Sequence, residues 1–177
     1  SVIIVLLFTS VLGAYVMVKG ISFDSIANCN LQRDVDILLA TIIRGPIEQG
    51  GKAFGLRSSS VMSATPPLPP PYPSPLPTWN NSQNQKAIYF TGLDDNIRGY
   101  FLNANNNAVI YDSPTQNPNQ RIIYTAPNNS SIVLRFATAS VDQQVATIYI
   151  SVVQQNAGRA SATGSVITNV NLRNAPK

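Results

Sequence analysis

Residues 1–18 read SVIIVLLFTSVLGAYVMV, and the first ionisable side chain of the protein is Lys19. Eighteen helical residues span about 27 Å at 1.5 Å per residue, close to the roughly 30 Å of a bilayer core. A helix that is apolar all round has to be buried in lipid or in other protein. We therefore expect residues 1–20 to form a helix that lies in a membrane or in the core of a filament.

Three other interpretations of this segment compete with that expectation. A signal peptide needs a basic start and a small-residue cleavage site, and nothing basic precedes the apolar run. A buried core helix needs a larger and less polar partner than residues 46–177 offer. A plain single-span membrane anchor is the strongest alternative.

The apolar segment contains the residues that we expect to be covered by lipid or by neighbouring helices. Leaving a large apolar side chain in water costs roughly 1.5–3 kcal/mol, and the small residues Ser10, Gly13 and Ala14 allow two helices to approach closely. The residues predicted to lie in a filament core or membrane are Ile3, Ile4, Val5, Leu6, Leu7, Phe8, Val11, Leu12, Gly13 and Ala14.

Residues 21–45 are predicted to continue the helix in amphipathic form. Apolar residues recur there at helical spacing on one face, and Gly45 followed by Pro46 is a typical stop signal. Gly20 weakens helix continuity and makes a kink or a break a reasonable expectation. The residues expected to pack on the rest of the domain are Phe23, Ile26, Leu31, Val35, Leu38 and Ile42.

Residues 46–85 are rich in Gly, Ser and Pro and are predicted to be a connecting loop with a short strand near Val61. Eight of the twelve residues in 66–77 are proline, which enforces an extended polyproline II path. We interpret this segment as a stiff connector, with a ligand for a proline-recognising domain as the alternative.

Residues 86–177 show the period-two pattern of strands and hairpins. We expect five to six short antiparallel strands, with a hairpin turn over the Asn-rich residues 103–107 and one sheet face covered by the helix. The fold class is therefore α+β: a long N-terminal helix packed on a small antiparallel sheet. These five to six strands are expected among seven stretches that carry the strand pattern, namely 87–90, 97–102, 108–111, 122–124, 131–138, 145–153 and 166–172.

The composition excludes several kinds of function. The net charge is +4, but the basic residues after residue 72 are scattered singly, so we interpret them as solvated surface charges and predict no nucleic-acid binding. One cysteine and no histidine leave the common metal sites and nucleophile pairs without ligands or bases. We predict no enzymatic activity, no cofactor and no metal. The scattered basic residues are Lys86, Arg98, Arg121, Arg135, Arg159, Arg173 and Lys177.

Three stretches resemble type IV pilins and the pseudopilins of type II secretion: the apolar residues 1–18, the sequences LQRDVD and IIRG at 31–36 and 42–45, and the closing residues 166–174, which end in NLRN. The resemblance implies a structural subunit of a filament assembled by bundling of N-terminal helices. It implies identical or related subunits as partners, storage in the inner membrane, and final localisation in an extracellular filament or periplasmic pseudopilus.

The sequence also departs from this family. Members begin with an aromatic residue, a short apolar stretch and a glutamate, so we expect the mature protein to start some residues before Ser1. Because Cys29 is the only cysteine, the disulfide-closed loop of many major pilins cannot form, which favours the minor pilins or the J-type pseudopilins.

A membrane-anchored adhesin or binding module with a β-domain is the alternative function. Aromatic side chains that would suit a binding patch occur in the second part of the chain, although core packing is expected for at least half of them. These residues are Tyr72, Trp79, Tyr89, Tyr100 and Tyr111.

Overall fold

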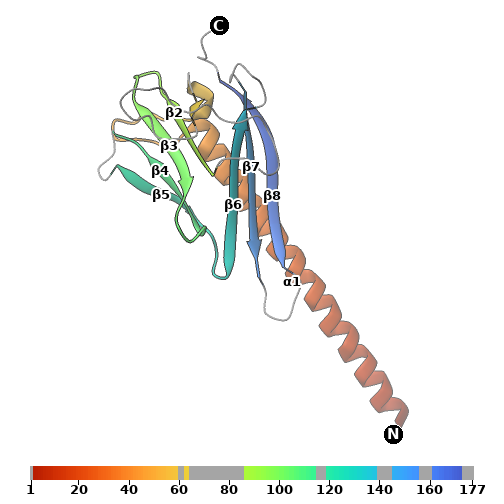
Figure 1. The fold of residues 1–177 in the computed structure, drawn as a ribbon. Helices are drawn as coiled ribbons and strands as arrows, with labels where there is room; N and C mark the ends of the chain where they lie inside the picture. Colours follow the sequence, from red (N-terminus) through yellow and green to blue (C-terminus); the bar gives the residue numbers. More distant parts are fainter. Residues whose placement is uncertain are drawn as a thin grey trace.

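The computed structural model describes residues 2–59, 62–63, 86–114, 119–138, 145–155 and 161–172, with the backbone alone for residues 2–8 and 62–63. The connector predicted at residues 66–77 lies outside the described residues. A long helix packs on two antiparallel sheets, which confirms the α+β class (Figure 1). The elements are α1 (Val2–Arg44), the 3-10 helix η1 (Leu56–Ser58), β1 (Met62–Ser63), β2 (Ala87–Thr91), β3 (Ile97–Leu102), β4 (Ala108–Asp112), β5 (Gln120–Thr125), β6 (Ser130–Thr138), β7 (Val145–Gln154) and β8 (Ala162–Asn171).

Helix α1 is continuous from Val2 to Arg44, so no break occurs at Gly20. It ends as predicted, because Gly45 has φ of 86° and its N–H donates to the carbonyl of Thr41 at 2.8 Å. Glycine takes this left-handed conformation without steric cost, and Pro46 cannot extend the helical hydrogen bonds.

The predicted strand stretches all form strands, and the short strand near Val61 is found at β1. The expectation of one sheet with five to six strands is wrong, because the structure has a five-stranded sheet in the order β1-β2-β3-β4-β5 and a separate sheet in the order β6-β7-β8. The chain leaves the first sheet between β5 and β6, where Pro127 offers no N–H and Asn129 has φ of 58°. This turn redirects β6 to pair with β7 over nine residue pairs.

The predicted hairpin turn between β3 and β4 is confirmed. Asn106 has φ of 52°, a conformation that asparagine tolerates better than most residues. The side-chain oxygen of Asn103 accepts hydrogen bonds from the N–H groups of Asn107 and Ala108 at 3.0 and 3.1 Å. The turn therefore supplies its own partners for the backbone.

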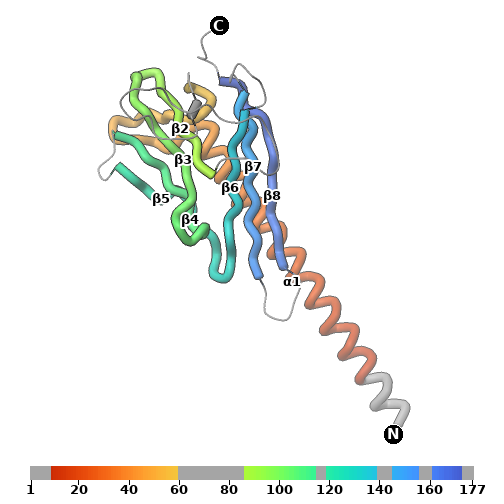
Figure 2. Tube along the Cα trace, in the orientation of Figure 1, coloured from red at the N-terminus to blue at the C-terminus, as the bar shows by residue number. Residues whose placement is uncertain are grey.

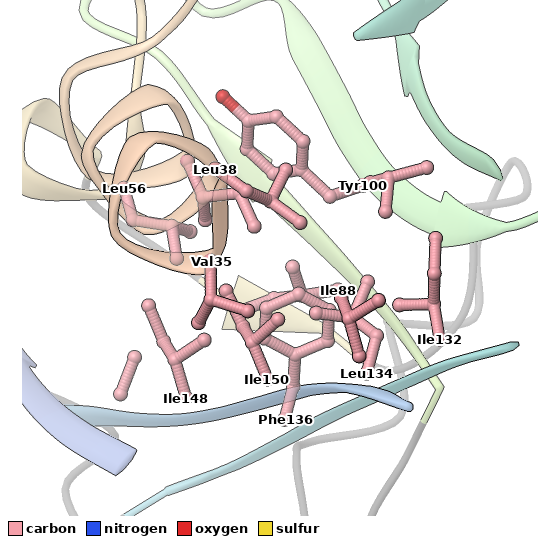
Figure 3. Packing of buried hydrophobic residues seen from close by; sticks show 14 of the residues in the cluster. Val35, Leu38, Leu56, Ile88, Tyr100, Ile132, Leu134, Phe136, Ile148 and Ile150 are labelled. Atoms are coloured by element: carbon pink, nitrogen blue, oxygen red, sulfur yellow. The ribbon is translucent and has the colours of Figure 1, made fainter. Parts of the chain in front are cut away.

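One hydrophobic core joins the second half of α1 to both sheets. Figure 3 shows Val35 and Leu38 of α1 beside residues of the first sheet and of the second. The helix stripe predicted at Leu31, Val35, Leu38 and Ile42 is completely buried. The buried partners include Ile88, Phe90, Tyr100, Leu134, Phe136, Ile148 and Ile150.

Phe23 and Ile26 do not pack on the sheets, which corrects the prediction, since their side chains are 55% and 54% exposed. Successive helical residues lie about 100° apart, so Phe23 points roughly 90° and Ile26 roughly 150° away from the buried stripe. The sheet-facing line of α1 continues instead through Ala27, which packs against the core.

Strand β8 lies at the edge of the second sheet, and side chains of helix α1 accept hydrogen bonds from its free edge. The N–H groups of Thr163 and Ser165 donate to the side-chain oxygens of Asn28 and Gln32 at 2.8 and 3.1 Å. Between them, a Cβ atom on Gly164 would lie 2.5 Å from the carbonyl carbon and oxygen of Leu31. Only glycine permits this close approach of strand and helix.

We predict that Gly164→Ala lowers the free energy of unfolding by about 1–3 kcal/mol, since the added methyl group meets helix backbone and forces the helix away from β8. Urea unfolding of the protein in mild detergent, followed by near-ultraviolet circular dichroism, measures the change. Ser165→Ala is the control, because that side chain is exposed and its loss is expected to cost under about 0.5 kcal/mol. Equal stability of the two variants would contradict the close approach.

Candidate functional site: the projecting apolar helix

The N-terminal part of α1 projects beyond the lower ends of both sheets (Figures 1 and 2). Every side chain from Thr9 to Lys19 is exposed. By length and composition, Thr9–Arg44 is the one helix in the described part of the chain that is apolar enough to cross a membrane. Helices of this kind serve as membrane anchors or as signal sequences.

The predicted lipid- or filament-facing residues lie on this projecting segment. Val11, Leu12, Gly13 and Ala14 are exposed, and a Cβ atom on Gly13 would meet no atom within 4 Å. Ile3 to Phe8 belong to the same helix by their backbone. The exposed apolar side chains of this segment, Val11 and Leu12 among them, require an apolar environment from outside the chain.

Three large apolar side chains between Lys19 and the part of the helix that packs on the sheets are also more than half exposed. Ile21, Phe23 and Ile26 are 63%, 55% and 54% exposed. Ile21 was not among the residues predicted from the sequence to be functional. Its position after Lys19 and before the buried stripe could have indicated an exposed apolar side chain. We call these three side chains the neck residues.

Tyr15 and Lys19 mark the boundary of the uncharged segment. The ammonium group of Lys19 lies 5.0 Å from the centre of the Tyr15 ring, within the range of a cation–π contact. Tyrosine and lysine side chains favour the interface between hydrocarbon and water, where the apolar part of each is covered and its polar end is hydrated. This pair is consistent with an apolar environment that ends near Lys19.

A buried ion pair fixes the loop after α1 to the first sheet. Glu48 and Arg98 are 4% and 1% exposed, and the Nε and Nη2 groups of Arg98 donate to Glu48 at 2.7 and 2.9 Å. Tyr111 and Ser113 donate their hydroxyl hydrogens to Glu48 Oε1 at 2.6 and 2.7 Å. These four hydrogen bonds to Glu48 compensate for its removal from water.

The remaining donors of Arg98 are also used. Its Nη1 and Nη2 groups donate to the two carboxylate oxygens of Asp94 at 2.7 and 2.8 Å, and Nη1 also donates to the carbonyl of Asn96 at 3.2 Å. The five N–H groups of the guanidinium are therefore all bonded. Its carbon atom lies 3.8 Å from the centre of the Phe54 ring.

Arg98 is therefore not a solvated surface charge, which corrects the prediction made for it. Burial lowers the pKa of Arg98, but its hydrogen bonds with Asp94 and Glu48 raise the pKa by more, so the group stays charged. Burial and the hydrogen bond to Glu48 raise the pKa of the Tyr111 hydroxyl. The arrangement is suited to holding the loop rather than to proton transfer, because each charged group is already neutralised by a partner.

The aromatic residues considered for a binding patch are separated by the fold. Tyr100 and Tyr111 are buried in the core with their ring centres 5.1 Å apart, whereas Tyr89 lies on the outer face of the first sheet. Tyr72 and Trp79 lie outside the described residues. Within the described ranges, no three His, Cys, Asp or Glu side chains form a group that suits a metal ion.

Comparisons of this chain with protein-family models, with curated proteins and with solved structures find no match.

Asp94 makes the stability of the domain sensitive to acid. Its hydrogen bond from Arg98 holds the pKa of its carboxyl well below the usual value of 3.8. A carboxyl with a lowered pKa contributes stability above its unfolded pKa and loses that contribution as the pH falls through the folded pKa. We predict that the urea midpoint begins to fall below about pH 4 and that Asp94→Asn is less stable at neutral pH but shows a flatter acid response. Parallel urea titrations between neutral and acidic pH measure this, and identical slopes for both proteins would contradict it.

Proposed function

We propose that this chain is a structural subunit of a type IV pilus-like filament, held together by bundling of its N-terminal helices. The support is physical: α1 joins an enclosed half, from Leu31 to Ile42, to a bare apolar half. The resemblance of residues 1–18, 31–36 and 42–45 to pilins and pseudopilins agrees with this arrangement.

The bare half is stable in two environments, a bilayer and a bundle of similar helices. Moving the segment from one to the other changes little of its apolar exposure, so a subunit stored in the membrane enters a polymer at small hydrophobic cost. Gly13 and Ala14 leave room for close helix contact. Identical contacts repeated by a rotation that does not close generate an open helical filament.

The neck residues favour a filament subunit over a plain membrane anchor. A bilayer that covers the helix up to Lys19 leaves the exposed parts of Ile21, Phe23 and Ile26 in water, and the helix packs on the core of the domain only from about Ala27. Covering each of these side chains is worth about 1.5–3 kcal/mol. Neighbouring subunits in a filament supply that cover, whereas an anchored monomer does not.

The partners in this proposal are identical or related subunits. The inner membrane holds the chain before assembly, and an extracellular filament or a periplasmic pseudopilus holds it afterwards. No nucleic acid, cofactor or catalytic step enters the proposal.

We predict that deleting residues 1–18 gives a soluble monomer that forms no fibres, because the deletion removes the apolar rod and leaves the enclosed half of α1 in place. Size-exclusion chromatography and electron microscopy of both proteins test this. Fibres formed by the truncated protein would show that the apolar segment is not what joins the subunits.

We predict that replacing all three neck residues, by Ile21→Ser, Phe23→Ser and Ile26→Ser, lowers the amount of polymer more than about tenfold and leaves membrane insertion unchanged. The control carries Ile122→Ser and Ile167→Ser, two exposed isoleucines on β5 and β8. Sedimentation of assembled material and flotation with vesicles measure the two properties. Unchanged polymer in the neck variant would favour an anchored monomer.

A further inference from the structure

The outer face of the five-stranded sheet carries a cleft of about 380 Å³ on the side of the sheet away from the core. Small-molecule sites in proteins typically have volumes of about 300–1,000 Å³. The cleft is lined by strand residues, chiefly Tyr89, Gly99 and Asp112, and by the turn that contains Asp95 and Asn96. The cleft is separate from the projecting helix, and the role given to the buried ion pair does not require a cleft on this face.

The cleft follows from one row of paired residues across four strands. Tyr89 pairs with Gly99, Gly99 with Asp112, and Asp112 with Gln120. Because side chains alternate between faces and Tyr100 points into the core, this row points outward. Because Gly99 has no side chain, the aromatic ring of Tyr89 has room above it, beside the carboxylate of Asp112.

The position of the Tyr89 ring depends on the absence of a side chain at Gly99. A Cβ atom on Gly99 would lie 2.6 Å from Cδ1 and Cε1 of Tyr89, so the ring leans over the glycine. Burial, with a contribution from Asp112, raises the pKa of the Tyr89 hydroxyl, which therefore stays protonated. The ring is half-buried and lines the cleft, so it offers both an apolar surface and a hydroxyl group to a ligand.

The polar atoms of the cleft are mainly acceptors. Asp112 Oδ2 accepts a hydrogen bond from Gln120 Nε2 at 3.3 Å, which fixes one side of the carboxylate. Asn96 donates its amide N–H to Asp94 at 3.0 Å, which orients the amide group. The ligand that satisfies such a site brings hydroxyl donors.

Anionic ligands do not suit the cleft. Among the described residues, Arg98 is the one basic residue that lines it, and all of the N–H donors of its guanidinium are bonded to Glu48, Asp94 and Asn96. The carboxylates of Asp95 and Asp112 would repel a phosphate or an acidic sugar.

We propose that this cleft binds a neutral sugar residue of a glycan, with one face of the sugar on Tyr89 and its hydroxyl groups donating to Asp112 and Asn96. Sugars combine apolar C–H faces with a rim of hydroxyl groups, which matches an aromatic ring that lies beside a carboxylate. A cation is the alternative ligand for the carboxylates of Asp95 and Asp112, and the test separates it from a sugar. The site is the same on a filament subunit and on an anchored monomer, so it does not depend on the proposed function.

The test uses the full chain in detergent micelles and titrates it with neutral oligosaccharides, namely cellotriose, maltotriose and chitotriose, with sialyllactose as the acidic sugar and pentalysine as the cation. Saturation-transfer NMR and calorimetry measure binding. We expect at least one neutral sugar to bind and sialyllactose and pentalysine not to bind. Tyr89→Ala and Asp112→Ala are each expected to weaken the neutral sugar by about tenfold or more, equivalent to about 1.4 kcal/mol.

Ile122→Ser is the matched control, since Ile122 lies on the same face in the neighbouring row, paired with Ile110, and does not line the cleft. It should bind the sugar as the unmodified chain does, and thermal unfolding verifies that each variant is folded. The proposal is overturned if none of the neutral sugars binds at millimolar concentration. It is also overturned if binding persists in folded Tyr89→Ala, or if pentalysine alone binds through Asp112.

Discussion

The structure depends on one constraint: α1 carries more apolar surface than its own chain covers. Both sheets enclose the helix from Leu31 to Ile42, whereas the side chains from Thr9 to Lys19 are all exposed. Buried apolar area is worth roughly 25 cal/mol per Å², and a folded domain is stable by only about 5–15 kcal/mol. The exposed apolar helix therefore needs an apolar environment supplied by lipid or by other protein, and that requirement limits where the chain is stable.

The polar interior of the domain obeys a related rule. Glu48 and Arg98 are removed from water, and each is paired with the other and hydrogen-bonded to further neighbours. The partners of Glu48 lie on β4 and just after it, and those of Arg98 lie in the turn before β3. Breaking such a buried pair usually costs about 3–5 kcal/mol, because the remaining charge is left without a partner. The buried pair therefore attaches the loop that follows the helix to the first sheet.

Local patterns predicted much of this fold. Helical spacing identified the buried stripe from Leu31 to Ile42, and period two located the strands, because both signals depend on neighbours in sequence. The same patterns missed the division into two sheets, which depends on the turn at Pro127 and Asn129. They also missed Glu48 with Arg98, which are fifty residues apart in sequence and have no spacing rule. Phe23 and Ile26 were assigned to the stripe because they are apolar. The rotation of about 100° per helical residue places both of them away from the buried face.

The contact between α1 and β8 has a mechanical consequence. Asn28, Gln32 and the backbone of Leu31 meet the first residues of β8 where the helix leaves the domain. Because α1 has no break at Gly20, a pull on its N-terminal end passes along a continuous rod and enters the globular part at this point. The pull runs along the strands of the second sheet, so the sheet resists it in shear, with many hydrogen bonds loaded together instead of one after another.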